Sequence, residues 1–174
     1  MAGRRSGAKY RLSPVQIISL SGMTITNADA RQQLLDVIAE ATADIGLALG
    51  SLGEAYERLD EQTADRLEQE LFRPVQLAYG RVQRTYAEFA TRHGLPTRRF
   101  EPASLGAPSH GVKELLDSAA DAVDRADVTL STLQDSMLPV EFGDAELRAG
   151  LQGVRELLGD LRPRARELVR TLGR

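Results

Sequence analysis

The sequence has no cysteine and no tryptophan, and only 5% of its residues are aromatic. Without cysteine there can be no disulfide, no thiolate metal ligand and no cysteine nucleophile. The scarcity of aromatic side chains leaves no platform on which nucleic-acid bases would stack. Histidine is almost absent as well, with His93 and His110 as its two copies.

An excess of charge of one sign is also lacking. The net charge is -3 at pH 7 and the isoelectric point is near 5.5. This balance produces no overall positive field, so no nucleic-acid partner is expected. With 174 residues, 42% of them hydrophobic, the chain is long enough to form one domain with a substantial core.

Residues 1–26 are expected to form an irregular, basic and apolar N-terminal arm. Its uncharged run from Leu12 to Ala28 is too short and too polar to span a membrane. One interpretation is an export signal, because Ala28-Asp29-Ala30 has the small-x-small pattern of a cleavage site. The other is an extension ahead of a core chain that starts at Met23. We expect a cytoplasmic protein.

Four runs of apolar residues, spaced by alternating steps of three and four, dominate the remaining chain. This spacing is typical of helices that pack along a common seam. It predicts an all-α fold, an antiparallel four-helix bundle made of two helical hairpins over residues 27–174. The predicted helices span residues 27–59, 61–93, 110–138 and 144–173. The first seam consists of Leu35, Ile38, Thr42, Ile45, Leu49, Leu52, Tyr56 and Leu59.

Capping patterns mark the predicted helix ends. His93-Gly94 is a typical C-terminal stop, because glycine adopts the left-handed conformation that ends many helices. Side-chain oxygens suited to accept from free N-terminal N–H groups precede each helix. The expected N-caps are Thr26 (in a capping box with Asp29), Asp60, Ser109 and Asp144.

The linker over residues 94–111 is rich in proline, glycine and serine, and it permits either an up-down-up-down return or a crossover. Residues 27–60 carry a net charge of -5 and residues 112–138 carry -4. The other two predicted helices are neutral (61–93) or slightly positive (139–174, +1). In an up-down bundle this pattern predicts that the two acidic helices lie on a diagonal.

Pro74 and Pro163 fall inside the second and fourth predicted helices. An interior proline removes a backbone hydrogen bond and kinks a helix, at a cost of about 3 kcal/mol. A hinge is one interpretation. The interpretation that we favour is a helix that begins again with proline in its first turn.

No pattern for catalysis, metal binding or nucleotide binding emerges. The seams contain no Glu-x-x-His motif, and no glycine-rich phosphate loop follows a strand. His93, His110 and Glu101 border one loop, where they would form a metal site if they met; solvated loop histidines are the simpler interpretation. We therefore expect no cofactor and no enzymatic activity. The third predicted helix carries a row of four aspartates. A helix spaces such carboxylates apart instead of directing them at one calcium ion, so we expect no calcium site there. They are Asp117, Asp121, Asp124 and Asp127.

The segment RPRARELVRTLGR, residues 162–174, holds five arginines and one acid. It would suit contact with phosphate or an anionic lipid surface. The interpretation that we favour is a helix end whose cations complement the helix dipole.

The stretch IGLALGSLG, residues 45–53, is uncharged and contains three glycines although it lies within a predicted helix. Each interior glycine costs about 0.8–1 kcal/mol relative to alanine, so close approach of another element is expected. A helix that is apolar on every side is normally covered on every side. The residues expected to be covered are Ala43, Gly46, Leu47, Gly50 and Gly53.

Three covers are open at this point. Gly150 and Gly153 of the fourth helix could pack against residues 46–53, or residues 15–25 could lie over Leu47. The third cover is a second copy or a partner helix. The expected function is a non-enzymatic interaction or scaffold module that self-associates or binds a partner helix through this face. The alternative is a carrier of apolar ligands or a lipid-surface binder.

Overall fold

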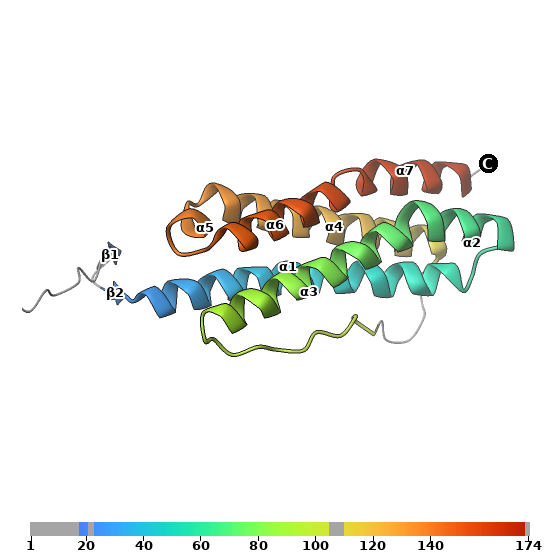
Figure 1. The fold of residues 1–174 in the computed structure, drawn as a ribbon. Helices are drawn as coiled ribbons and strands as arrows, with labels where there is room; N and C mark the ends of the chain where they lie inside the picture. The colour runs from blue at the N-terminus through green and yellow to red at the C-terminus, as the bar shows by residue number, and fades with distance from the viewer. Residues whose placement is uncertain (1–17, 21–22, 105–109, 173–174) are drawn as a thin grey trace, which may run out of the picture.

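The computed structural model describes residues 18–20, 23–104 and 110–172 (Figure 1). Its regular structure is helical except for a short hairpin ahead of the first helix, so the predicted all-α class is confirmed. The five longer helices pack against one another. They are α1 (Asn27–Tyr56), α3 (Arg73–Arg92), α4 (Val112–Asp135), α6 (Ala145–Leu158) and α7 (Leu161–Leu172). The shorter elements are α2 (Glu61–Leu67), the π-helix η1 (Glu68–Phe72) and α5 (Leu138–Glu141).

The hairpin pairs β1 (Ile18–Leu20) with β2 (Met23–Ile25) in antiparallel register, with Ile18 opposite Ile25. It lies beyond the start of α1 (Figure 1). Residues 18–20 and 23–25 therefore do not cover Leu47. For these described residues, the expectation that the segment 15–25 lies over Leu47 is wrong. Residues 1–17 and 21–22, which hold most of the expected signal or extension, lie outside the described residues.

Three of the predicted N-caps are confirmed. The Thr26 hydroxyl accepts from the Asp29 N–H, and the Asp29 carboxylate accepts from the Thr26 N–H, both at 3.1 Å. Asp60 caps α2 through the Thr63 N–H, and Asp144 caps α6. Hydrogen bonds from Thr26 and Thr63 lower the pKa values of Asp29 and Asp60. Ser109 lies outside the described residues, and α4 has Gly111 as its N-cap.

The interpretation that we favoured, a helix that begins again at the proline, holds for Pro163 but not for Pro74. Pro74 is the second residue of α3, yet α2, η1 and α3 follow one another without a break, so the helix continues through Pro74 with the π-helical turn of η1 just before it. Pro163 is the third residue of α7, after a break at Gly159 and Asp160. The single helix predicted over residues 144–173 is therefore two helices, because a new first turn needs no N–H from the proline.

The predicted diagonal placement of the acidic helices is wrong, because α1 packs more extensively against α4 than against any other described element. The N-terminal part of α1 lies beside α5, where Arg31 Nε donates to the Phe142 carbonyl at 3.2 Å. Arg58, just after α1, contacts the carbonyl of His110 just before α4. The linker must therefore cross the length of the helices before α4 begins.

Arginine bridges relieve the repulsion between acidic residues at this contact. Arg125 of α4 lies 3.1 Å from Asp44 of α1. Two further carboxylates of α4 pair with the neighbouring helices, Asp127 with Arg155 at 2.9 Å and Asp124 with Arg162 at 2.7 Å. These pairs are partly exposed, so each contributes little to stability and mainly fixes which helices lie together.

The core follows the predicted seams. Leu35, Ile38 and Ile45 are fully buried, and so is Thr42, whose hydroxyl donates to the Ile38 carbonyl at 2.7 Å. The hydroxyl is satisfied within its own helix, which makes a polar residue tolerable at a seam position. Tyr56, at the end of the first seam, is instead 37% exposed.

The expected packing of Gly150 and Gly153 against α1 is also wrong. A Cβ at Gly150 would lie 2.7 Å from Cγ2 of Thr85, and one at Gly153 would lie 2.7 Å from Cζ of Arg81. Both Thr85 and Arg81 belong to α3. The two glycines therefore permit close approach of α6 to α3.

Replacement of Gly150 by alanine should lower the free energy of unfolding by about 1–2 kcal/mol, because overpacking outweighs the gain in helix propensity. Thr85 is short and β-branched, and its hydroxyl is bonded to the Arg81 carbonyl at 2.9 Å, so it cannot move aside easily. Gly80→Ala is the matched control, because a Cβ at Gly80 would meet nothing within 4 Å. This variant should raise the free energy of unfolding by up to about 1 kcal/mol, because alanine favours the helix more than glycine does. Urea denaturation of both variants measures the difference.

Asp144 joins the end of α3 to the start of α6. Its carboxylate accepts two hydrogen bonds from Arg92 at 2.9 Å, one from the Leu147 N–H at 2.7 Å, and lies 3.0 Å from Nε2 of His93. Burial opposes ionisation of this carboxyl group. The hydrogen bonds from Arg92, Leu147 and His93 outweigh that effect and lower the pKa of Asp144 to about 2.

A pKa that is lowered in the folded state gives stability above the unfolded pKa and loses it as the pH falls towards 2. Asp144→Asn keeps the helix cap but removes the charge, so it should lower the free energy of unfolding by about 2 kcal/mol at pH 7. The difference in the free energy of unfolding between this variant and the wild type should disappear as the pH falls from about 4 to about 2. Denaturant titrations across this range test the prediction, and the same substitution at an exposed position, Asp135→Asn, is the control.

Candidate functional site

The small residues of the uncharged stretch share one face of α1. Ala43, Gly46, Gly50 and Gly53 follow one another at steps of three and four, which places them in a row along the helix. We call this row the small-residue face. Ala43 is exposed, Gly46 is buried, and Gly50 and Gly53 are partly buried.

Leu47 lies at the edge of this row, four residues after Ala43 and three before Gly50. It is partly buried and packs against the hydrophobic core. It is three residues after Asp44 and four before Ser51, and both of these side chains contact α4. The structure thus brings four of the five predicted interface residues together and assigns Leu47 to the side of α1 that faces α4.

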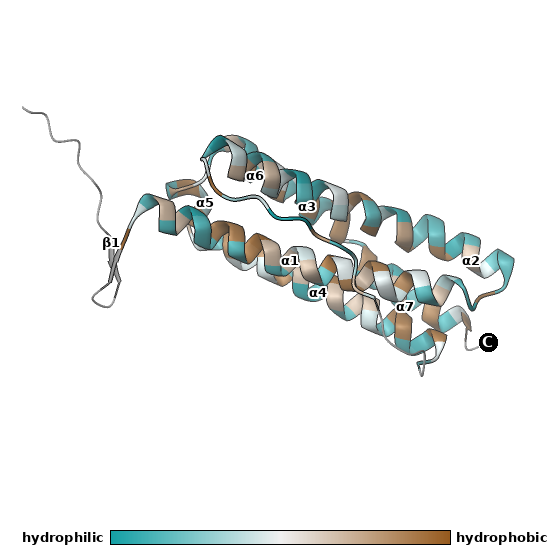
Figure 2. Ribbon diagram, turned by 90° about the horizontal axis from the view of Figure 1, so that it is seen from below, coloured by the Kyte–Doolittle hydropathy of each residue, from teal (hydrophilic) through white to brown (hydrophobic). Residues whose placement is uncertain are grey.

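The linker after α3 provides the cover over the small-residue face. Gly94 has φ +65°, and the Leu95 N–H donates to the Ala90 carbonyl at 2.8 Å, which ends α3 at the predicted stop. Residues 94–104, which we call the strap, then continue without helix or strand. Figure 2 shows the strap running between α1 and α3. We call the surface that these helices present to the strap, which includes Gly46, Tyr79 and Tyr86, the α1–α3 groove.

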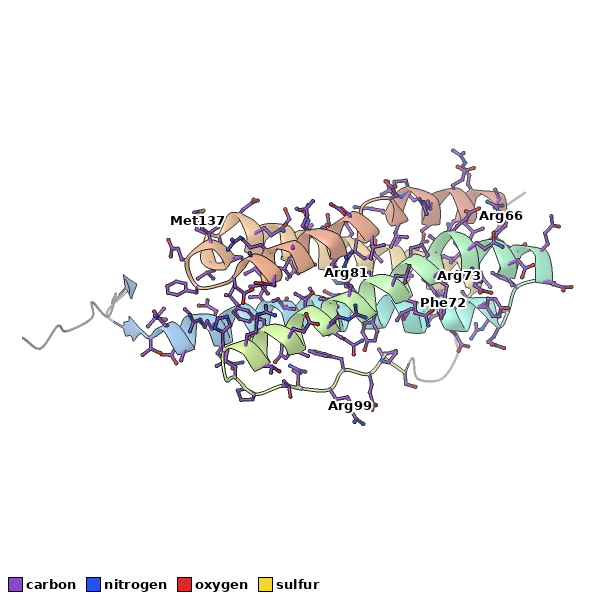
Figure 3. The ribbon with its side chains drawn as sticks, viewed as in Figure 1. Arg66, Phe72, Arg73, Arg81, Arg99 and Met137 are labelled. Carbon is purple, nitrogen blue, oxygen red and sulfur yellow. The ribbon has the colours of Figure 1, made fainter. Side chains whose placement is uncertain are left out.

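Aromatic and backbone contacts hold the strap in this groove. Phe100 packs edge-on against Tyr86, with ring centroids 5.1 Å apart, and the Arg98 guanidinium lies 4.8 Å from the centroid of the Phe100 ring. The Ala103 N–H donates to the Gly46 carbonyl at 3.4 Å. By contrast, Arg99 points away from the helices (Figure 3).

Gly46 is required by this arrangement. A Cβ there would lie 3.3 Å from Cε2 of Tyr79 and 3.6 Å from Cα of Pro102. An α3 side chain and the strap backbone therefore meet above the same backbone position of α1. The close approach expected from the glycines is real at Gly46, and it is intramolecular.

Tyr79 lies beneath the strap and is only 8% exposed. Within the described residues, its hydroxyl is the buried side-chain polar atom that has no hydrogen-bond partner. Burial raises its pKa, and the charge of Glu101 raises it further. A buried unsatisfied hydroxyl costs about 1–3 kcal/mol, so this group needs an explanation.

The end of the small-residue face nearest α2 borders an open groove. Its volume is about 210 Å³, and it is lined by Gly53, Tyr56, Glu57, Glu68 and Phe72. A Cβ at Gly53 would meet nothing within 4 Å. The far wall is the π-helix η1, whose Phe72 is labelled in Figure 3, and π-helical turns are often found at functional sites.

The histidines do not meet. His93 pairs with Asp144 at the start of α6, whereas His110 lies 3.0 Å from Glu114 at the start of α4. The metal site considered for the two histidines and Glu101 is therefore not formed, because the linker crosses the length of the helices and separates His93 from His110. The described residues contain no cluster of three metal-binding side chains. Asp124 and Asp127 are occupied by ion pairs with α7 and α6.

One void lies between core side chains of the described helices. It is bordered by Leu52, Val75, Val123 and Leu161 and measures about 10 Å³. That is about the minimum for one water molecule. Among the described helices, none is long and apolar enough to cross a membrane.

Sequence reasoning missed the residues that cover Gly46, namely Tyr79, Pro102 and Ala103, and it missed Phe100, which packs the strap against Tyr86. One signal was available, because Leu95 and Phe100 are the two large apolar side chains among residues 94–104. The linker length left both a short return and a crossover open, so the groove could not be assigned from the sequence.

No protein-family model, curated protein or solved structure matches this chain at a significant level. The function is therefore argued from the geometry of its own surface.

Tyr79→Phe should raise the free energy of unfolding by about 1 kcal/mol, because it removes a buried hydroxyl that has no partner. Urea denaturation at pH 7 measures this change. Tyr56→Phe is the control, since Tyr56 is 37% exposed and should leave the stability unchanged. A loss of stability in Tyr79→Phe would show that the hydroxyl is satisfied after all.

Proposed function

We propose that this chain is a non-enzymatic helical interaction module that docks a partner helix, either of a second copy or of another protein, on the outer face of α1. The observation that carries the proposal is the open groove beside Gly53. A helix glycine with free space above its Cα lets a partner backbone or side chain approach closely. Tyr56 and Phe72 supply apolar walls, and aromatic side chains are frequent anchors at protein interfaces.

The charges around the groove define the partner. Glu57 and Glu68 lie among its lining residues, so its rim is acidic while its walls are apolar. It suits a helix that presents an apolar side chain flanked by arginine or lysine. The chain itself has such a helix, because α7 combines Val169 and Leu172 with exposed Arg166 and Arg170. A second copy is therefore the first partner to test.

The scaffold of this module is, in our proposal, an antiparallel four-helix bundle of two helical hairpins joined by the strap. Two contacts support it. Near the start of α1, Arg31 donates to the carbonyl of Phe142, and the end of α3 meets the start of α6 through Arg92 and Asp144. The α6 and α7 segments then act together as the fourth rod. Such a rigid frame would keep the face of α1 in place.

The alternative function, a carrier of apolar ligands or a lipid-surface binder, receives less support. A carrier of the kind considered from the sequence would open along its seams to hold an apolar ligand. The seam residues of α1 from Leu35 to Leu52 are buried within a packed core. The open space that favours an interaction lies on the outside of α1, at Gly53.

Self-association should be visible as a mass that increases with protein concentration in multi-angle light scattering. Gly53→Leu should abolish it, because the leucine side chain fills the groove while leucine also favours the helix. Gly80→Leu is a matched control on α3, where the glycine also has open space around its Cβ position, and it should associate like the wild type.

A wild-type protein that stays monomeric at every concentration would remove the self-associating form of the proposal. Association that survives in Gly53→Leu would show that the groove is not the contact surface. Circular dichroism of each variant confirms that the helices are intact.

A further inference from the structure

The strap lies in the groove between α1 and α3 in the way that a bound peptide would. The strap has no helix or strand. Its residues are exposed except for Leu95, Phe100 and Ala103, which are partly buried. Its hydrogen bond to α1 is the long one from the Ala103 N–H to the Gly46 carbonyl. The strap is therefore held mainly by Phe100 on Tyr86 and by the close approach of Pro102 to Gly46.

The groove beneath the strap has a polar group that the strap leaves unused. The Tyr79 hydroxyl is buried, unpaired among the described residues, and next to the Cβ position of Gly46 at 3.6 Å. The Cα of Pro102 lies at the same distance from that position. Proline has no N–H to donate, and the described strap residues place no acceptor within hydrogen-bond distance, so the strap covers the hydroxyl without satisfying it.

We infer that the α1–α3 groove is a peptide-binding groove that the strap occupies, and that a partner segment in extended conformation displaces it. The partner places an aromatic side chain against Tyr86 and a hydrogen-bond acceptor at the Tyr79 hydroxyl. This inference goes beyond the proposed docking of a helix at Gly53, because it concerns a second binding region of α1, at Gly46, and a partner in extended conformation.

The strap itself supplies the recognition pattern. Phe100 and Ala103 are three residues apart, and they contact Tyr86 and Gly46 respectively. A competing segment therefore needs an aromatic residue followed three positions later by a small residue with a free N–H. An acceptor side chain at the position of Pro102 would add the bond that the strap cannot make.

Tethering gives the strap a large advantage over any free peptide, because its effective concentration is in the millimolar range or above. The partner gains access in proportion to the fraction of molecules in which the strap is open. Weakening one strap contact should therefore increase the affinity for a peptide in trans without changing the groove itself.

The first test uses a fluorescein-labelled peptide with the sequence of residues 94–104, titrated into the full chain and followed by anisotropy. Phe100→Ala, which removes the contact with Tyr86, should bind this peptide at least about tenfold more tightly than the wild type. Ala103→Pro, which removes the N–H donated to Gly46, should do the same. Thr97→Ala is the matched control at an exposed strap position and should bind like the wild type.

The second test concerns the hydroxyl. A peptide carrying Pro102→Asn should bind the Phe100→Ala protein several-fold more tightly than the parent peptide. The gain should vanish when the protein also carries Tyr79→Phe, because the amide oxygen then has no donor. A purely structural role of Tyr79 would leave the ratio of the two peptide affinities unchanged.

Two results overturn the inference. One is a failure of the peptide to bind either loosened variant when circular dichroism shows native helix content. The other is an equal affinity for the two peptides, or a gain that persists in Tyr79→Phe. Gly53→Leu should leave peptide binding intact, so a failure of the Gly53 groove as the docking surface is distinguishable from a failure of the strap inference.

Discussion

The packing of α1 against α4 is the constraint on which the remaining arrangement depends. Two acidic helices lie together because alanine and serine allow a close approach, as at Ser51 and Ser118, whose hydroxyl oxygens are 3.5 Å apart. The bridge from Arg125 to Asp44 compensates part of the like charge. With α4 beginning beside the end of α1, the chain that leaves α3 must return along the helices. The course of the strap along the helices, and its position over Gly46, therefore follow from the packing of α1 against α4.

The strap in turn explains why α1 is apolar on almost every side. Its seam faces the core, Leu47 packs towards α4, and Gly46 lies beneath Tyr79 and Pro102. A composition that resembles an unpartnered surface thus receives most of its cover from the chain itself. The cover is incomplete at both ends of the small-residue face, since Ala43 is exposed and Gly53 faces an open groove. Intramolecular cover and an external contact are therefore compatible on one helix face.

Helix glycines have three different roles in this molecule, although their sequence contexts are alike. Gly46 admits the strap, Gly150 admits the Thr85 side chain of α3, and Gly53 and Gly80 have open space around them. Propensity assigns all four the same cost in a helix. The distinction arises from the neighbouring element, which may be a linker, another helix or solvent. For this reason the predicted pairing of Gly150 with α1 was wrong even though the expectation of close packing there was right.

The local sequence by itself determined the all-α class, the seams, the caps at Thr26, Asp60 and Asp144, and the fresh helix start at Pro163. These features depend on side chains within a turn or two of each other, so periodicity and capping chemistry suffice to predict them. Only the tertiary structure decided which helices are neighbours, that the histidines lie apart, and that residues 94–104 cover Gly46. Those outcomes depend on the direction of the linker, and its composition allows a short return and a crossover equally. Long-range pairing is set by the summed packing of whole helix faces, which no single stretch of sequence contains.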